Sequence, residues 1–286
     1  MRKKKWNIND ILLYLLLLLF AAILCSPVYL LISGSFMAQD ELSIYLRPAI
    51  TEGDTYVRFS LLPVLFTLRG YVELLLDTPE FFHMFWNSIK LVTLILLGQL
   101  CIAVPAAWGF ARMKLKGKDM LFFLYIILML MPFQVTMLSN YLTLNKLGML
   151  DTHQAIIWPA VFSTFPVFLL HRFFADIPNS ILEAARIDGA GRMHLFIKIG
   201  CPLASPGIMA AMVLGYLEYW NLVEQPLIFL KDKTLWPLTL YLPQIGLENA
   251  QIAFVSSVIV LLPSALVFFA GQDHLEQGIA ASAVKE

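Results

Sequence analysis

Polar side chains interrupt an apolar segment in the C-terminal third of the chain, and their spacing could support binding chemistry. Glu218, Asn221 and Gln225 recur at i, i+3 and i+7, which places them on one face of a helix. Trp220 and Glu224 share another face. Carboxylate and amide groups pair with hydroxyls, and an aromatic plane covers C–H surface, so this pattern suits a sugar. The alternative is interhelical hydrogen bonding, with Glu224 at the outer membrane interface.

The position of these groups within the apolar segment favours the binding interpretation over hydrogen bonding between helices. A charge near the bilayer centre, as expected for Glu218, costs about 2.5–3.5 kcal/mol and usually faces protein or a water-filled path. Pro226 lacks the N–H that would bond the carbonyl of Leu222, so we expect a freed carbonyl and a local bend. Freed carbonyls are tolerated at membrane depth where they line a cavity. We therefore predict that this face lines a translocation cavity.

A second group of residues predicts a short helix in a loop rich in Arg and Lys. Ser180 and Glu183 have the spacing of a capping box, and Gly189 can take the left-handed conformation that ends a helix. So short a helix is marginal alone and needs a surface to pack against. An ordinary amphipathic helix lying on the membrane is the alternative. The residues that suit contact with a partner are small or polar: Ala184, Ala185, Arg186 and Asp188.

Sequence patterns of the common catalytic and metal-binding classes are missing. No GxxxxGK[ST] motif occurs, since Gly117-Lys118 is followed by Asp119 and lacks the earlier Gly. The five His residues form no HExxH pair, and there is no G-x-S-x-G element. An intramembrane enzyme would need a catalytic pair facing one cavity, and the sequence offers no convincing one. We therefore expect no metal or cofactor bound by this chain.

The elements that must position these residues are membrane-spanning helices. Of the 286 residues, 59% are hydrophobic and 14% are charged, and the apolar residues come in long blocks. Cys25, Cys101 and Cys201 are interpreted as small buried hydrophobic residues, not as a disulfide or metal framework. The first apolar block is too long for a typical cleavable signal. We predict an all-α membrane protein with six spans, at about 11–33, 87–110, 120–142, 154–172, 205–228 and 252–271.

Lys and Arg predict the orientation of these spans, because they are more frequent in cytoplasmic segments. Both termini and the loop 173–203 are expected in the cytoplasm. The segment 34–83 is then an outer loop with an interfacial helix near 71–76, and 229–251 is a compact outer loop. The inner side holds the larger share of basic residues: Arg2, Lys3, Lys4, Lys5, Arg112, Lys114, Lys116, Lys118, Arg172, Arg186, Arg192, Lys198 and Lys285.

The loop resembles the "EAA" loop of bacterial ABC importer permeases: Glu-Ala-Ala, three residues, Gly, nine residues, Ile-x-Leu-Pro. Glu183, Gly189, Ile199 and Pro202 match it, and Cys201 stands where the family has Leu. The chain from about 87 to its end is similar to MalG-like permeases of carbohydrate importers. That similarity is carried by Glu183–Ala190, Tyr219-Trp220-Asn221, Leu262-Pro263-Ser264, Gly271-Gln272 and Gly278-Ile279, whereas Glu224-Gln225 departs from the apolar residues expected there.

The resemblance implies a type I ABC importer permease with a cytoplasmic coupling helix between spans four and five. Residues 1–86 would form an N-terminal span and long extracytoplasmic loop, and 87–286 the core permease domain with the coupling loop 173–203. The residues implied for ATPase coupling are Glu183, Ala184, Ala185, Asp188 and Gly189. The substrate pathway predicted above comprises Glu218, Trp220, Asn221, Glu224 and Gln225.

The function implied by the resemblance is transport, not catalysis. The chain would form half of a sugar pathway in the bacterial cytoplasmic membrane, and ATP would be used by a partner. Implied partners are a second related permease, two copies of a cytoplasmic ABC ATPase and an extracytoplasmic solute-binding protein. A permease for a non-sugar solute is one alternative. An ion-coupled secondary transporter using Glu218 or Glu224 is another, but it has no reason to carry the coupling loop.

Overall fold

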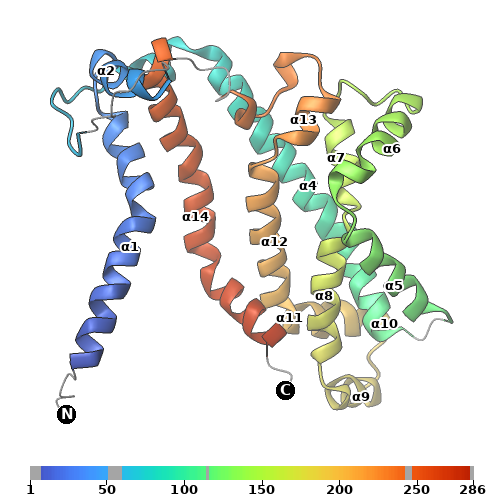
Figure 1. The fold of residues 1–286 in the computed structure, drawn as a ribbon. Coiled ribbons are helices and arrows are strands. Elements are labelled where there is room, and N and C mark those ends of the chain that lie inside the picture. The colour runs from blue at the N-terminus through green and yellow to red at the C-terminus, as the bar shows by residue number, and fades with distance from the viewer. Residues whose placement is uncertain (1–7, 51–59, 114–115, 242–246, 284–286) are drawn as a thin grey trace. The chain divides into compact units, whose positions relative to one another are not determined.

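The chain folds almost entirely into helices, as the apolar blocks predict. The computed structural model describes residues 8–50, 60–113, 116–241 and 247–283. Within these ranges the regular elements are helices, and the β structure is an isolated antiparallel bridge between Met37 and Phe66. The predicted all-α fold is confirmed. Two compact units form, one from residues 1–81 with 242–261 and one from 82–241 with 262–286 (Figure 1).

The first unit is built on the N-terminal helix and on the start of the C-terminal helix. The hydroxyl of Ser35 lies 2.8 Å from that of Tyr71, and Ser33 donates a 2.7 Å hydrogen bond to the carbonyl of Leu61. The predicted interfacial helix near 71–76 is helical in the structure. The elements of this unit are α1 (Ile8–Ser35), α2 (Gln39–Ile50), α3 (Arg69–Val72), η1 (Glu73–Asp77), η6 (Leu247–Asn249) and the beginning of α14 (Ala250–Ala283).

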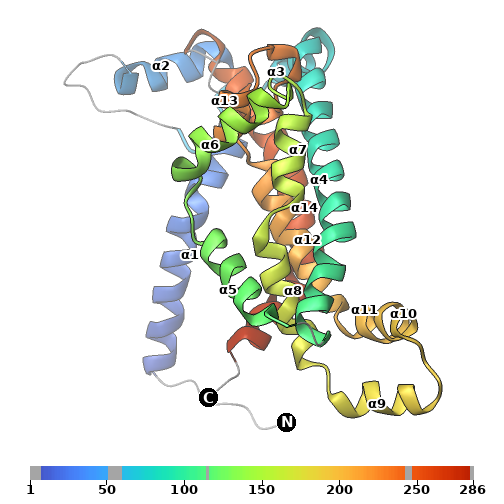
Figure 2. The same cartoon turned by 90° about the vertical axis from the view of Figure 1, so that its right-hand side faces the viewer.

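The second unit contains the regions predicted to couple and to transport. Its larger helices are α4 (Pro79–Arg112), α5 (Lys118–Met129), α6 (Phe133–Lys146), α7 (Gln154–Val161), α8 (Thr164–Asp176), α9 (Asn179–Ile187), α12 (Ser205–Trp220), α13 (Glu224–Phe229) and the rest of α14. The short elements are α10 (Arg192–His194), η2 (Leu195–Gly200), α11 (Cys201–Leu203), η3 (Lys233–Leu235) and η4 (Leu238–Leu240). Helices α9 to α11 lie at one end of this unit, and α6 and α13 lie at the other (Figures 1 and 2).

The predicted spans correspond to helices, but two of them are bent. Among the residues that the structure describes, four helical segments are long and apolar enough to cross a membrane: Leu12–Ser35, Pro79–Arg112, Gln154–Asp176 and Ala250–Glu276. Two further bent pairs also qualify by length and composition, α5 with α6 and the 192–203 segment with α12. If each pair is one span, the described residues hold six candidate spans, the predicted number, although the second pair includes residues 192–203, which were predicted to lie in the cytoplasmic loop.

The third predicted span, at about 120–142, consists of two helices and not one. Helix α5 ends at Met129, α6 begins at Phe133, and the two differ in direction by 101°. Pro132 has φ −65° and ψ 144°, an extended conformation. A proline also disfavours helical geometry in the residue before it, here Met131, so the sequence contains the reason for the break.

The core of the second unit joins the ends of α4 and α8 to the predicted coupling loop. Trp108 meets Phe174 edge-on at 5.4 Å between ring centroids, and Phe196 lies 5.7 Å from the same indole. Leu182 of α9 belongs to this buried cluster. Gly200 is required for the packing, because a Cβ there would lie 2.5 Å from the Trp108 ring. The loop is therefore tied to the membrane helices by tertiary packing.

Candidate functional site

The predicted coupling helix is present as α9, but it starts differently from the expectation. The helix begins at Asn179, directly after Pro178 in an extended conformation, and no side-chain cap is formed. Ser180 therefore lies in the first turn, and the predicted capping box with Glu183 is wrong. Proline fixes its own φ and disfavours helical geometry in the preceding Ile177, so Pro178 sets the start of the helix without a capping side chain.

The end of α9 confirms the role predicted for Gly189. Gly189 has φ +85°, in the left-handed region that glycine adopts without strain. The amide of Ala190 donates to the carbonyl of Ala185 at 2.9 Å, and that of Gly189 donates to Arg186 at 3.0 Å. These bonds satisfy carbonyls that a helix end otherwise leaves open. A residue with a side chain would meet nothing within 4 Å at this position, so the requirement for glycine is one of backbone conformation.

One side of α9 packs inward and the other is exposed. Leu182 is buried, and Ala185 packs partly against the same core, so Ala185 contributes to packing within the chain. Glu183, Ala184, Arg186 and Asp188 are exposed. Sequence reasoning missed the large apolar side chains beside them: Ile181, Ile187, Met193 and Ile197 are all exposed, Ile187 by 87% of its surface. A helix with one buried and one apolar exposed side offers a surface for another protein.

The start of α9 is held by an arginine that the sequence analysis counted only as an inner-side charge. Arg112, the last residue of α4, donates from Nε to the carbonyl of Phe174 at 2.7 Å. Its Nη1 donates to Oδ1 of Asn179 at 2.8 Å. Its Nη2 donates to the carbonyls of Ala175, at 3.1 Å, and Ile177. These partners are 62 to 67 residues away in sequence, so no local pattern could have indicated them.

The predicted pathway residues do not share one helical face, because the helix is interrupted. Helix α12 ends at Trp220 and α13 begins at Glu224, so the fifth span, predicted over 205–228 with a local bend, is interrupted. The i, i+3, i+7 relation of Glu218, Asn221 and Gln225 therefore fails. Pro226 contributes to the break, since a proline cannot donate to the carbonyl four residues earlier. Asn221 closes α12 by donating from Nδ2 to the carbonyl of Leu217 at 2.7 Å.

The five candidates also differ in exposure. Trp220 is 1% exposed, because its ring stacks on Tyr216 at 5.6 Å and meets Phe85 edge-on at 6.0 Å. The aromatic plane expected for a sugar is therefore not available on Trp220. Gln225 is half-buried, and its Oε1 has no hydrogen-bond partner among the described residues. The candidates that remain exposed are Glu218, Asn221 and Glu224.

Glu224 links the two interrupted spans. The Nε2 atom of Gln134, in the first turn of α6, lies 3.1 Å from each carboxylate oxygen of Glu224, in the first turn of α13. Helices α6 and α13 each begin directly after a break in a predicted span. The contact between Gln134 and Glu224 therefore connects the two breaks. The amide and the carboxylate are exposed and can accept or donate further bonds to a polar molecule.

A buried glutamine and the three predicted free cysteines lie outside the candidate pathway. Gln99 is buried, and its Nε2 donates to the carbonyl of Ala160 at 2.8 Å and to the Tyr219 hydroxyl at 2.9 Å. The cysteines are free, as predicted, but Cys25 and Cys101 are exposed on the isolated chain and not buried. Both lie on long apolar helices, α1 and α4, whose exposed surfaces would be in contact with lipid in a membrane. The described residues contain no group of three His, Cys, Asp or Glu side chains able to hold a metal ion.

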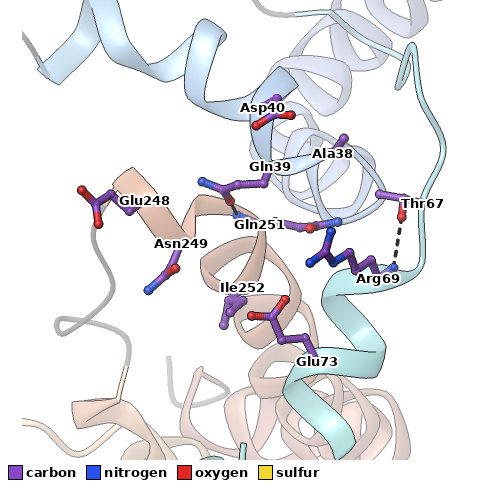
Figure 3. Close-up of a pocket in the computed structure, with 10 residues that line it drawn as sticks. All are labelled: Ala38, Gln39, Asp40, Thr67, Arg69, Glu73, Glu248, Asn249, Gln251 and Ile252. Atoms are coloured by element: carbon purple, nitrogen blue, oxygen red, sulfur yellow. Dashed lines mark hydrogen bonds between the residues drawn. The ribbon is translucent and has the colours of Figure 1, made fainter. Parts of the chain in front are cut away.

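The first unit holds a polar pocket of about 430 Å³ that no sequence pattern indicated (Figure 3). The backbone N–H of Gln251 donates to Oε1 of Gln39 at 2.8 Å, which caps the start of α14. The Gln251 side chain is 4% exposed, and its Nε2 has no partner among the described residues. The pocket is lined by Ala38, Gln39, Asp40, Thr67, Arg69, Glu73, Glu248, Asn249, Gln251 and Ile252.

Comparison with known proteins places these features in a family. Residues 99–281 match the model described as "Binding-protein-dependent transport system inner membrane component". The matched region runs from the middle of α4 to near the end of α14 and includes α9, α12 and α13. It therefore contains both the predicted coupling helix and the exposed polar residues beside the bends.

Two relatives that align with this chain over nearly their whole length are described as transport system permease proteins. The polygalacturonan/rhamnogalacturonan transport system permease protein YtcP of Bacillus subtilis is 27% identical over 299 residues, covering 98% of this chain and 99% of that protein. The arabinooligosaccharides transport system permease protein AraQ of Bacillus subtilis is 26% identical, covering 98% of each. A crystal structure of a bacterial ABC transporter involved in alginate import matches with a TM-score of 0.78 and 22% identity, covering 95% of this chain and 99% of that one. The structural likeness shows a shared fold.

Proposed function

Because the chain belongs to the family of binding-protein-dependent transport system inner membrane components, we propose that it is a permease subunit of an ATP-driven oligosaccharide importer. The observation that carries this proposal is the family match over residues 99–281, which includes the coupling loop. The saccharide class is supported by the names of the two full-length relatives. The chain is a multi-pass membrane protein, with apolar helices long enough to span a bilayer.

The exposed side of α9 and the adjoining turn would dock on a separate ATPase. Glu183, Ala184, Asp188 and Gly189 lie on or beside this surface, and Ile187 projects an apolar side chain from it. Apolar anchors surrounded by polar residues are the usual make-up of a protein interface. In this proposal ATP is bound and hydrolysed by the partner, and no cofactor is bound by this chain.

The substrate pathway would run beside the bends near Glu218, Asn221 and Glu224. Their exposed carboxylates and amide offer the donors and acceptors that sugar hydroxyls require. The pathway would be completed by a second, related permease subunit. Closure of two ATPase subunits would displace the coupling helices and open the cavity outward, to receive sugar from a solute-binding protein. Hydrolysis would return the inward-open state, as in alternating access between two conformations.

This function can be tested by the proteins that accompany the chain. An affinity-tagged chain should be expressed in the organism from which it comes and extracted in mild detergent. It should then purify together with an ABC ATPase that hydrolyses ATP. Ile187→Asp should abolish this association, because a charge replaces an apolar anchor. Ile44→Asp is the matched control, an exposed isoleucine of α2 outside the proposed interface. Absence of an ATPase from the wild-type preparation would contradict the proposal, as would full retention by Ile187→Asp.

A further inference from the structure

The guanidinium of Arg112 connects three elements at the end of the second unit where α9 lies. It sits at the last position of α4 and donates to the carbonyls of Phe174 and Ala175, which are in the final turn of α8. It also bonds the carbonyl of Ile177 in the linker and Oδ1 of Asn179, the first residue of α9. One side chain therefore contacts the end of one helix and the beginning of the next.

The chemistry of this contact favours arginine specifically. The last carbonyls of a helix have no partner within the helix and carry partial negative charge, so a cation there is stabilising. The guanidinium has five N–H donors in a fixed plane and can satisfy several carbonyls together with an amide oxygen. A lysine would keep the charge but would present its donors from one point, and could not span Phe174 and Asn179 in the same way.

Apolar packing next to the guanidinium reinforces the same connection. Trp108, one turn before Arg112 on α4, contacts Phe174 of α8 and Phe196 of η2. Leu182 of α9 is buried in the same cluster. The polar and apolar contacts thus hold the ends of α4 and α8 and the start of α9 as one block.

We infer that Arg112 is a positioning residue that makes α9 move together with α4 and α8. This inference rests on the proposed function, in which a docked ATPase displaces α9. With Arg112 in place, a displacement of α9 is passed to the long helix α4. Without it, α9 can still bind a partner through its exposed side, but it rocks on the Ile177–Pro178 linker and less of its movement reaches the membrane helices.

The connection can be measured in the full-length chain alone. Spin labels are placed at Ile187→Cys on α9 and at Leu97→Cys on α4, both exposed positions, after Cys25, Cys101 and Cys201 are replaced by Ala. In lipid nanodiscs, pulsed electron paramagnetic resonance should give a single narrow distance peak. Arg112→Lys and Asn179→Ala should each replace this peak by a broad distribution. Asn179→Asp retains the acceptor oxygen and should keep the peak narrow.

The matched control is Arg172→Lys, because Arg172 is an exposed arginine on the same end of α8. It should leave the distance distribution unchanged. Arg112→Lys and Asn179→Ala are mild substitutions on opposite sides of one contact. A broad distance distribution in both variants is therefore not explained by misfolding of one of them. A narrow peak in both Arg112→Lys and Asn179→Ala would overturn the inference, and this outcome does not depend on any ATPase or substrate.

The same variants give a functional measurement in the assembled transporter. Arg112→Lys should bind the ATPase normally, while the amount of substrate moved per ATP hydrolysed falls several-fold, because less of the movement of α9 reaches α4. A purely structural role would lower assembly and leave this ratio unchanged, and that result would contradict the inference. If no ATPase associates with the wild-type chain, the proposed function fails, whereas the distance measurement still decides the role of Arg112.

Discussion

The hydroxyl of Thr239 donates a 2.5 Å hydrogen bond to the carbonyl of Leu222, the group that Pro226 leaves without a helical partner. The sequence predicted that the proline would free this carbonyl within a helix; in the structure Leu222 lies between α12 and α13, and its carbonyl is paired with the Thr239 hydroxyl. The bond also ties the break between α12 and α13 to η4, so the bend has a defined geometry. Asn221 and Glu224 are exposed residues beside this break, the position expected of groups that line a polar path.

Removing the Thr239 hydroxyl should destabilise this break. Thr239→Val keeps the shape of the side chain but leaves the Leu222 carbonyl unpaired, which costs about 1–3 kcal/mol for a desolvated acceptor. Thr239→Ser keeps the donor and serves as the control. Thermal unfolding of the purified chain, followed by tryptophan fluorescence, should show a lower midpoint for the valine variant only. Equal midpoints for the valine and serine variants would show that the hydrogen bond does not stabilise the bend.

Gly189 should tolerate asparagine better than valine. Its φ of +85° is open to glycine and, to a smaller extent, to asparagine, while other residues pay about 1–2 kcal/mol there. No neighbouring atom would obstruct a side chain, so the penalty comes from the backbone alone. We expect Gly189→Val to insert normally in the membrane but to weaken ATPase binding and uptake, and Gly189→Asn to retain most of both. Unchanged uptake by the valine variant at equal expression would count against the docking role.

His153, which precedes α7, should make stability depend on pH. Burial lowers the pKa of His153 from its ordinary value of 6.5, the charge of Lys90 acts in the same direction, and the contact with the Leu235 carbonyl opposes them. The folded chain thus binds this proton less readily than the unfolded chain. The stabilisation is present above pH 6.5 and is lost as the pH falls below that value through the lowered pKa.

The measurement for His153 compares unfolding midpoints above and below pH 6.5. Wild type should lose more stability on acidification than His153→Gln, whose amide can still reach the Leu235 carbonyl but does not titrate. All carboxylates are common to the two proteins, so the difference isolates the histidine. Parallel pH profiles for the two proteins would rule out a titrating contribution from this residue.

Substitution of Asn221 tests whether its amide lines the substrate pathway or only caps the end of α12. Asn221→Leu removes an exposed amide and its bond to the Leu217 carbonyl. We expect lower uptake with normal assembly, checked by pull-down of the ATPase, because the residue lies at the end of the unit opposite α9. Val223→Leu, at a neighbouring exposed apolar position, should transport normally. If Asn221→Leu fails only through lost assembly, the amide is a structural cap and its assignment to the pathway should be dropped.

The parts of this fold that depend on composition and local sequence were predictable. Long apolar blocks indicated the spans, and Gly189 indicated the end of α9. Pro132 also accounts for the break in the third span, although the apolar pattern continues across it. Pro178, rather than Ser180, sets the start of α9, because a proline can begin a helix without any capping side chain.

Contacts between distant residues were beyond sequence reasoning. The burial of Trp220 depends in part on Phe85, which belongs to α4. In the sequence, Arg112 is not distinguished from any other charged residue at the end of a predicted span. Only the folded chain brings it to Asn179, and only the folded chain separates Gln225 from the face that holds Glu218.

The central claim is that this chain carries saccharides across a membrane using ATP hydrolysed by another subunit. The most direct measurement is uptake of labelled oligosaccharides by vesicles containing the purified complex, with the solute-binding protein outside and ATP inside. Uptake should require ATP and the binding protein, should continue when ion gradients are dissipated, and should be lost in a complex carrying Ile187→Asp. Uptake driven by an ion gradient without ATP, or no saccharide uptake by an ATP-hydrolysing complex, would contradict it.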